Sequence, residues 1–161
     1  MKLPPILSAY RETPIETFNG VRISDPTPAN PDDDRGPVYE LYQGIPGQQL
    51  SVLVRKEGVV FGDHFHRGKD PSKDPEYFYF VSGTAVLSAF DRKTKTRMTA
   101  KIGPHTLVEI DPFIFHRFEA ETDVVFIEYR RSLYDPADPD DGTVEEYITE
   151  PEQDPKTGES S

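Results

Sequence analysis

The sequence predicts an all-β protein that forms a single antiparallel barrel, and two observations lead to this prediction. Short runs rich in Val, Ile, Phe and Tyr recur from Val38 onward, separated by clusters of turn residues. No long run places apolar side chains at the i, i+3, i+4, i+7 spacing of an amphipathic helix, so we expect little helix. Many short, evenly spaced strands are typical of a sandwich or barrel.

Most of the predicted strands are bounded by Gly, Pro, Asp or Ser clusters. They cover residues 38–43, 50–56, 59–66, 76–81, 84–91, 96–102, 106–110, 115–120 and 124–130. Upstream, Asn19-Gly20 is a hairpin signal and predicts one or two further short strands.

Composition divides the chain into three parts. Residues 1–36 form an N-terminal extension with short strands, 37–131 the barrel, and 132–161 an acidic tail that we expect to be partly disordered. Of the net charge of −11, the barrel contributes nothing, since it holds thirteen basic and thirteen acidic residues. The tail holds one Lys against ten acids. With no basic stripe, we expect no nucleic-acid partner.

The cellular setting is predicted from what the sequence lacks. No stretch approaches the roughly 20 apolar residues of a membrane span, and two prolines interrupt the short apolar start MKLPPILSAY. The chain has no cysteine, which excludes disulfides and thiolate metal sites. We therefore expect a cytoplasmic protein without membrane partners.

Two of the four histidines, His64 and His66, lie two residues apart in a predicted strand. Alternation places them on one face together with Val60 and Gly62. It places three neighbours on the opposite face: Phe61, Asp63 and Phe65.

Glu76 and His116 complete a candidate site. Glu76 begins the next strand and shares its face with Phe78 and Phe80, whereas His116 lies on an otherwise apolar strand face. Three imidazoles and one carboxylate that converge inside a barrel suit a divalent transition metal, namely Mn, Fe, Co, Ni, Cu or Zn. We therefore predict a metal site at His64, His66, Glu76 and His116.

The spacing Gly58-x5-His64-x-His66, followed by Glu76-x6-Gly83, resembles the first motif of the cupin superfamily. The segment DPFIFHRFEAETDVVFIEY resembles the second motif of the same superfamily, with His116 at the position of the metal ligand. The resemblance implies a jelly-roll-like cupin barrel whose metal ligands are the four residues above. Nine residues separate His66 from Glu76, so this loop is longer than the three or four residues usual in the family.

A narrower likeness links the chain to cupins that modify nucleotide-linked sugars. The stretches DDRGPVYELYQG, QQLSVLVRKEGVVFGDHFH and SLYDPADPDD resemble the C-terminal cupin domains of capsular-polysaccharide enzymes. The rhamnose-pathway epimerases are looser relatives that act without metal through a His base and a Tyr acid. Here Phe61-Gly62 replaces their Arg-Gly pair.

Several further residues have two readings. Tyr77 and Tyr79 face outward and need cover, either from a second barrel in a homodimer or from the N-terminal segment. Lys69 and Lys73 are placed near the pocket mouth, where they meet an anionic substrate or only solvent. His105 is expected to be exposed in a turn.

Three functions remain open. The first is a metal-dependent isomerase, epimerase or related enzyme acting on a carbohydrate or sugar-nucleotide, with metal-bound hydroxide or Glu128 carrying the proton. Glu128 can carry the proton only if Ala120 pairs with Val124, because this pairing brings Glu128 opposite His116. The second is a non-catalytic module that binds a metal or small ligand. The third is a metal-free enzyme in which His64 or His66 is the base and a tyrosine is the acid: Tyr39, Tyr42 or Tyr129.

Overall fold

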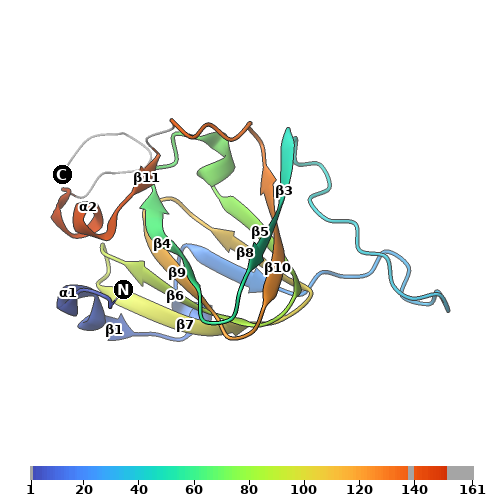
Figure 1. Cartoon of the computed structure of the whole chain (residues 1–161), viewed down its shortest axis with the longest axis horizontal. Helices are drawn as coiled ribbons and strands as arrows, with labels where there is room; N and C mark the ends of the chain where they lie inside the picture. Colours follow the sequence, from blue (N-terminus) through green and yellow to red (C-terminus); the bar gives the residue numbers. More distant parts are fainter. Residues whose placement is uncertain (1, 138–139, 152–161) are drawn as a thin grey trace.

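Two β-sheets pack face to face in the computed structural model, which describes residues 2–137 and 140–151 (Figure 1). One sheet has six strands in the order β1-β7-β6-β9-β4-β11, and the other has five in the order β2-β8-β5-β10-β3. All pairings among the described strands are antiparallel except that of β1 with β7. The fold is a jelly-roll sandwich of the cupin type, which confirms the predicted fold class.

The elements of the described residues follow one another along the chain as α1 (Pro5–Ser8), β1 (Arg11–Glu12), the 3-10 helix η1 (Ile15–Thr17), β2 (Val21–Ser24), β3 (Gln49–Arg55), β4 (Val60–His66), the 3-10 helix η2 (Pro71–Lys73), β5 (Glu76–Ser82), β6 (Ala85–Asp91), β7 (Thr96–Ile102), β8 (Thr106–Ile110), β9 (Ile114–Ala120), β10 (Val124–Arg130), β11 (Asp141–Gly142) and α2 (Val144–Thr149). None of the helices in these ranges is long and apolar enough to cross a bilayer.

Eight of the nine predicted strands are present, each within one residue of its predicted ends. The strand predicted over 38–43 is wrong. Its aromatic side chains lie flat against the second sheet instead of entering a ladder, and Tyr42 stacks on Tyr129 with ring centroids 4.6 Å apart. The hairpin at Asn19-Gly20 is also wrong, because β2 after this turn pairs with the distant β8. Three strands come from outside residues 37–131: β1 and β11 are the edges of the six-stranded sheet, and β2 is one edge of the five-stranded sheet.

The main core lies between the sheets. Phenylalanines from three strands meet there: Phe78 and Phe80 on β5, Phe118 on β9 and Phe126 on β10. All four are buried, and burying a side chain of this size stabilises the fold by about 1.5–3 kcal/mol. This aromatic cluster forms the base on which the polar site is built.

A second cluster covers the outer face of the six-stranded sheet, where α1 and α2 pack (Figure 1). Tyr147 of α2 is fully buried there, and its hydroxyl donates to the carbonyl oxygen of Phe90 at 2.7 Å. A capping box between Thr143 and Glu146 starts this helix. Tyr147 thus ties this part of the acidic tail to the sheet, while the partial disorder predicted for the tail lies outside the described residues.

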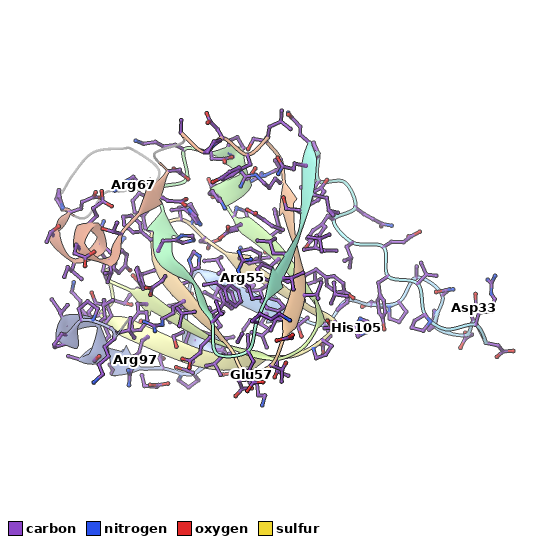
Figure 2. All side chains as sticks on the ribbon, in the orientation of Figure 1. Asp33, Arg55, Glu57, Arg67, Arg97 and His105 are labelled. Atoms are coloured by element: carbon purple, nitrogen blue, oxygen red, sulfur yellow. The ribbon has the colours of Figure 1, made fainter. Side chains whose placement is uncertain are left out.

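The segment between β2 and β3, residues 25–48, is called the arm here. It extends away from the body of the molecule, and Asp33 lies near its tip (Figures 1 and 2). Where the arm returns, Tyr42 contacts both Tyr77 and Tyr129 on the outer face of the five-stranded sheet. Tyr77 is therefore covered by a residue of the same chain that follows the predicted N-terminal extension of residues 1–36.

Candidate functional site

Strand β4 presents His64 and His66 to the interior, but it contains a bulge that the sequence reading missed. Its register with β9 shifts between Gly62 and His64, and Gly62 and Asp63 have positive φ angles of 73° and 58°. The extra residue reverses the alternation. Phe61 therefore lines the interior on the same side as His64, and its predicted outward placement is wrong.

Gly62 has a specific reason to be glycine. A Cβ atom built there would lie 3.3 Å from Cδ2 of His116, in a backbone conformation that L side chains rarely adopt. The absence of a side chain lets β4 approach β9 closely enough for His64 to lie opposite His116.

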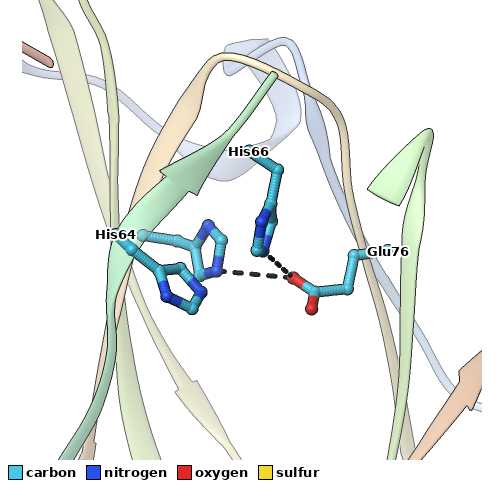
Figure 3. Close-up of side chains that lie close together, drawn as sticks. His64, His66 and Glu76 are labelled. Atoms are coloured by element: carbon cyan, nitrogen blue, oxygen red, sulfur yellow. Dashed lines mark hydrogen bonds and ion pairs between the residues drawn. The ribbon is translucent and has the colours of Figure 1, made fainter. Parts of the chain in front are cut away.

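The structure brings together the four predicted ligand residues. One ligand atom from each of His64, His66, Glu76 and His116 lies within 4.8 Å of the others, and three of the residues are labelled in Figure 3. Oε2 of Glu76 is 3.1 Å from Nε2 of His66 and 3.4 Å from Nε2 of His116. Because metal–nitrogen bonds are about 2.0–2.1 Å long, two ligands on one ion are at most about 4.2 Å apart. Small side-chain rotations would be needed to bring the four atoms within this distance.

His116 has the tautomer that a metal requires. Its Nδ1 is 3.1 Å from the carbonyl oxygen of Ile114, which only accepts, so Nδ1 carries the proton and donates. Burial, and then the nearby His64, lower the pKa of His116 to about 3, so the ring is neutral. Its buried Nε2 consequently presents a lone pair to the cluster without a hydrogen-bond partner in the described residues.

The other two histidines differ in charge. Burial opposes protonation of His66, but the carboxylates of Glu76 and Asp141 outweigh it and raise its pKa to about 9. Nδ1 of His66 is 2.7 Å from Oδ1 of Asp141. Burial and then the charge of His66 lower the pKa of His64 to about 4. Without a metal, the cluster therefore holds one imidazolium and two neutral imidazoles at neutral pH.

Asp141 is a site residue that the sequence reading assigned only to the acidic tail. The short strand β11 pairs Asp141 with His66 across the end of β4, which returns the tail to the histidine pair. Its position a third of the way through the apparently solvated acidic tail gave no signal of this role. A carboxylate bound to the far nitrogen of a ligand histidine fixes the orientation of the ring.

A chain of buried and partly buried ion pairs continues from Glu76. Lys73 contacts Oε1 of Glu76 and lies 2.8 Å from Oε1 of Glu128. Arg130 then links Glu128, at 2.9 Å, to Asp70, at 2.5 Å. Lys73 is held between two carboxylates, which raise its pKa against the effect of burial. Lys73 therefore lines the cavity with two carboxylate partners from the chain itself.

Glu128 reaches the cavity by a route other than the predicted one. Ala120 and Val124 lie in different sheets and do not pair; β10 pairs instead with β3 and β5, where Glu128 faces Ser51 and Phe78. Lys73 and Arg130 both contact its Oε1. Within the described residues, no cation is paired with Oε2, which is available to a ligand.

The cavity has a volume of about 180 Å³ and two unlike ends. The histidines and the ion pairs form the polar end. Four stacked or edge-on rings form the aromatic end: Phe61, Phe78, Phe118 and Phe126. Arg55 and Tyr134 also line the cavity, and in the view of Figure 2 Arg55 is seen between β3 and β4.

The remaining candidates lie away from this cavity. His105 is exposed as expected, and its Nδ1 is 2.7 Å from the hydroxyl of Tyr79 on the outer face (Figure 2). Tyr129 donates to the carbonyl oxygen of Ile45, also on that face. Tyr39, beside His105, and Tyr42, beside Tyr129, are likewise outside, so none of the three proposed tyrosine acids reaches the histidines. Lys69 is exposed.

The charges of the site fit a divalent cation. The connected ion pairs contain four carboxylates, on Asp70, Glu76, Glu128 and Asp141, against the permanent cations Lys73 and Arg130. Two negative charges remain, and the protonated His66 balances one of them. A divalent ion that displaces this proton would balance both, because a metal binds neutral imidazole.

Comparison with known proteins supports the fold and identifies a family. Residues 31–142 match the family model described as the polysaccharide biosynthesis C-terminal domain. A search of curated proteins found no significant match.

Among solved structures, the capsular polysaccharide assembling protein CapF from Staphylococcus aureus is 28% identical, with a TM-score of 0.51 over 69% of this chain and 32% of CapF. The chain thus spans about a third of CapF. The 3'-monoepimerase ChmJ from Streptomyces bikiniensis, in complex with dTDP-quinovose, is 19% identical, with a TM-score of 0.63 over 79% of this chain and 70% of ChmJ. The dTDP-4-dehydrorhamnose 3,5-epimerase from Sulfolobus tokodaii is 22% identical, with a TM-score of 0.61 over 79% and 78%. At these identities the two epimerases establish a shared fold.

Proposed function

Since this chain belongs to the polysaccharide biosynthesis C-terminal domain family, we propose that it is a metal-dependent cupin enzyme acting on a carbohydrate or sugar-nucleotide. The reaction class is isomerisation, epimerisation or a related proton transfer. The observation that carries the proposal is the convergence of His64, His66, Glu76 and His116 at the buried end of a cavity. The solved neighbours named as sugar-nucleotide epimerases support the substrate class.

Two sets of residues have separate roles in this proposal: one would bind the metal and the other would act on the substrate. The four clustered side chains would hold one Mn, Fe, Co, Ni, Cu or Zn ion, with Asp141 orienting His66. When bound, the ion supplies a Lewis acid that polarises a substrate carbonyl. Glu128 accepts and returns the substrate proton through Oε2, while Lys73 and Arg130 hold its other oxygen in place.

The aromatic end and the mouth bind the rest of the substrate. Rings such as Phe61 and Phe126 present flat apolar surfaces on which a sugar face packs. Arg55 contacts the ring of Phe61 and the carbonyl of Val54, and no carboxylate of the described residues pairs with it. Its guanidinium would receive the anionic part of a sugar-nucleotide. Cytoplasmic nucleotide-sugar metabolism and a homodimeric state are part of this proposal.

A two-step experiment tests the proposal. Protein purified without a tag or chelator is analysed for metals, and we expect one divalent transition metal per chain, lost in His66→Ala and Glu76→Ala. Nucleoside-diphosphate keto-sugars are then incubated with the protein in deuterated water. Proton transfer at a carbon beside the carbonyl is detected as deuterium incorporation by NMR, which we expect in the parent and not in Glu128→Gln. A metal-free parent that still exchanges deuterium would overturn the metal assignment.

The metal-free acid–base enzyme remains a second candidate, supported by one observation. His64 is neutral, partly exposed to the cavity, and its Nδ1 lies 3.7 Å from Oδ2 of Asp141. A base needs this protonation state, and the carboxylate would stabilise the imidazolium that forms. The phenol of Tyr134, which lines the same cavity, is the matching acid. Deuterium exchange that survives chelation and is lost in both His64→Asn and Tyr134→Phe would favour this candidate.

A further inference from the structure

The four clustered ligand residues are accessible from two sides. One is the cavity, and the other is a second hollow, called the side hollow here, which is lined by residues 62–64 and 141–145 and has a volume of about 340 Å³. His64 and Asp141 line both. The side chain of His64 is 28% exposed, whereas those of the other three ligand residues are at most 3% exposed. His64 is therefore the ligand residue that an ion from solvent meets first.

The side hollow exists because β11 is too short to cover β4. It pairs with β4 only at Phe65 and His66, and the chain then leads into α2. In Figure 1, β11 lies beside the end of β4, and α2 follows it. Residues 62–64 consequently have no strand neighbour on this side within the part of the chain that the structure describes. The bulge of β4 falls in this uncovered stretch, where bulges often redirect side chains next to a site.

The two approaches differ in charge. Three carboxylates line the side hollow, on Asp63, Asp141 and Glu145, and no lysine or arginine is among its lining residues. Glu145 is exposed and has no cationic partner in the described residues, whereas Asp63 is 3.5 Å from Arg117. The cavity mouth instead carries Arg55, whose guanidinium no carboxylate of the described residues neutralises. A cation is therefore attracted to the side hollow and repelled at the mouth.

We propose that the side hollow is the entry route of the metal ion, separate from the cavity mouth that receives the substrate. Glu145 and Asp63 attract the hydrated divalent cation, and Asp141 leads it to His64. Asp141 suits this step because it borders the hollow and contacts the ligand pair: its Oδ2 is 3.7 Å from Nδ1 of His64, and its Oδ1 is 2.7 Å from Nδ1 of His66. The hollow is also large enough, since six waters at about 30 Å³ each occupy about 180 Å³.

The end of this route is marked independently of its carboxylates. Nε2 of His116 is buried without a hydrogen-bond partner in the described residues, and a ligand atom from each of the other three residues lies within 4.8 Å of it. The carboxylates of the side hollow thus lead to a ligand set and are not a binding site by themselves. The inference rests on the metal assignment of the proposed function, and it adds a path by which the ion avoids Arg55.

The rate of cobalt uptake tests the route without any measurement of activity. Stripped protein is mixed with Co²⁺ in a stopped-flow instrument, and the visible absorption of bound cobalt reports binding. The variant Asp63→Asn/Glu145→Gln removes two charges and keeps the shape, because Asn tolerates the positive φ of Asp63 as Asp does. At low ionic strength we expect its association rate to fall about tenfold. Its Kd should change by less than about threefold, because the four ligands are intact. Release of cobalt from loaded protein into excess chelator should slow in parallel.

Two controls separate the route from the net charge of the chain. Glu16→Gln/Glu57→Gln removes the same charge from exposed positions outside the side hollow and should take up cobalt at the parent rate, as should Arg55→Gln. Uptake that is faster in Arg55→Gln and unchanged in Asp63→Asn/Glu145→Gln would place the entry at the cavity mouth and overturn the inference. So would a Kd that weakens as much as the association rate, because the carboxylates would then act on the bound ion.

The same measurements distinguish failure of the route from failure of the metal assignment. A parent protein that binds no cobalt at equilibrium would overturn both. Stoichiometric cobalt that enters the parent and Asp63→Asn/Glu145→Gln at equal rates would overturn the route alone.

Discussion

The two ends of the cavity are built from the same strands by different physical rules. On β9, His116 lies at the polar end and Phe118, two residues later, at the aromatic end; on β5, Glu76 and Phe78 repeat this step. The rings need only fill space, and each contacts several others. The polar groups must each find a partner of the right charge, because an unpaired buried charge is costly. Stability should therefore depend most on the aromatic end and ligand binding on the polar end.

The largest expected effect comes from truncating the aromatic end. Phe118 is 1% exposed and packs against Phe61, Phe78 and Phe80. Phe118→Ala removes these contacts and leaves a cavity, so we expect the free energy of unfolding to fall by about 3–5 kcal/mol. Chemical denaturation of metal-stripped protein measures this change.

His116→Ala is the matched control on the same strand. Its Nε2 has no hydrogen-bond partner in the described residues, so stripped protein should lose only about 1–2 kcal/mol. Metal binding, by contrast, should be abolished in His116→Ala and retained in folded Phe118→Ala. Equal losses of stability in the two variants would contradict the division between the ends.

Lys73→Met tests how the polar end is stabilised before a metal binds. Removal of the ammonium leaves Glu76 and Glu128 without their shared cation, and breaking a buried pair in this way costs about 3 kcal/mol. We expect this loss in stripped protein, with one metal per chain still bound by the unchanged ligands. The difference in unfolding free energy between loaded and stripped protein should widen, because the ion then compensates Glu76 for the loss of one of its two cationic partners, the other being His66.

Lys69→Met is the control for this loop. Its side chain is exposed, so its stability should change by less than about 0.5 kcal/mol. If Lys73→Met had no more effect than this control, the ion-pair chain would contribute nothing to the stripped state.

The sequence predicts the aromatic end and the strand ladder better than the polar end, for a physical reason. Alternation and turn residues are local signals, and they place eight strands and the inward Phe78 and Phe80 correctly. The bulge at Gly62 adds one residue to β4 and reverses the alternation upstream of it, which turns Phe61 inward. A glycine within a strand is a recognised sign of a bulge, so this signal was present.

The ion pairs of the polar end depend on contacts that local patterns do not encode. Arg130 and Asp70 are sixty residues apart, and Asp141 joins His66 from a segment whose composition resembles a solvated tail. The position of Lys73 follows from the long loop after His66, which folds back through η2. Such pairings become visible only when the topology is known, because charge alone does not say which partner is near.

Asp70 tests the far end of the ion-pair chain, where the smallest effect is expected. Oδ1 of Asp70 accepts from the Ser72 amide at 2.8 Å and from the Ser132 hydroxyl, while Oδ2 contacts Arg130. Burial acts to raise the pKa of this carboxyl, but the bonds from Ser132 and Ser72 and the charge of Arg130 outweigh it and hold the pKa below its usual range. Asp70→Asn keeps most of the shape and removes the charge, so we expect a loss of about 1–2 kcal/mol at neutral pH.

The direction of the Asp70 pKa shift determines how this difference in stability changes with pH. A carboxyl whose pKa is lower in the folded protein contributes stability that is complete above its unfolded pKa and disappears as pH falls through the folded one. The difference in unfolding free energy between the parent and Asp70→Asn should therefore be constant down to about pH 5 and shrink below about pH 4. Because Asp70 touches none of the four clustered ligand residues, metal content should not change. A difference that grows in acid would contradict the lowered pKa of Asp70. A lower metal content in Asp70→Asn than in the parent would show that Asp70 influences the four clustered residues through the ion-pair chain.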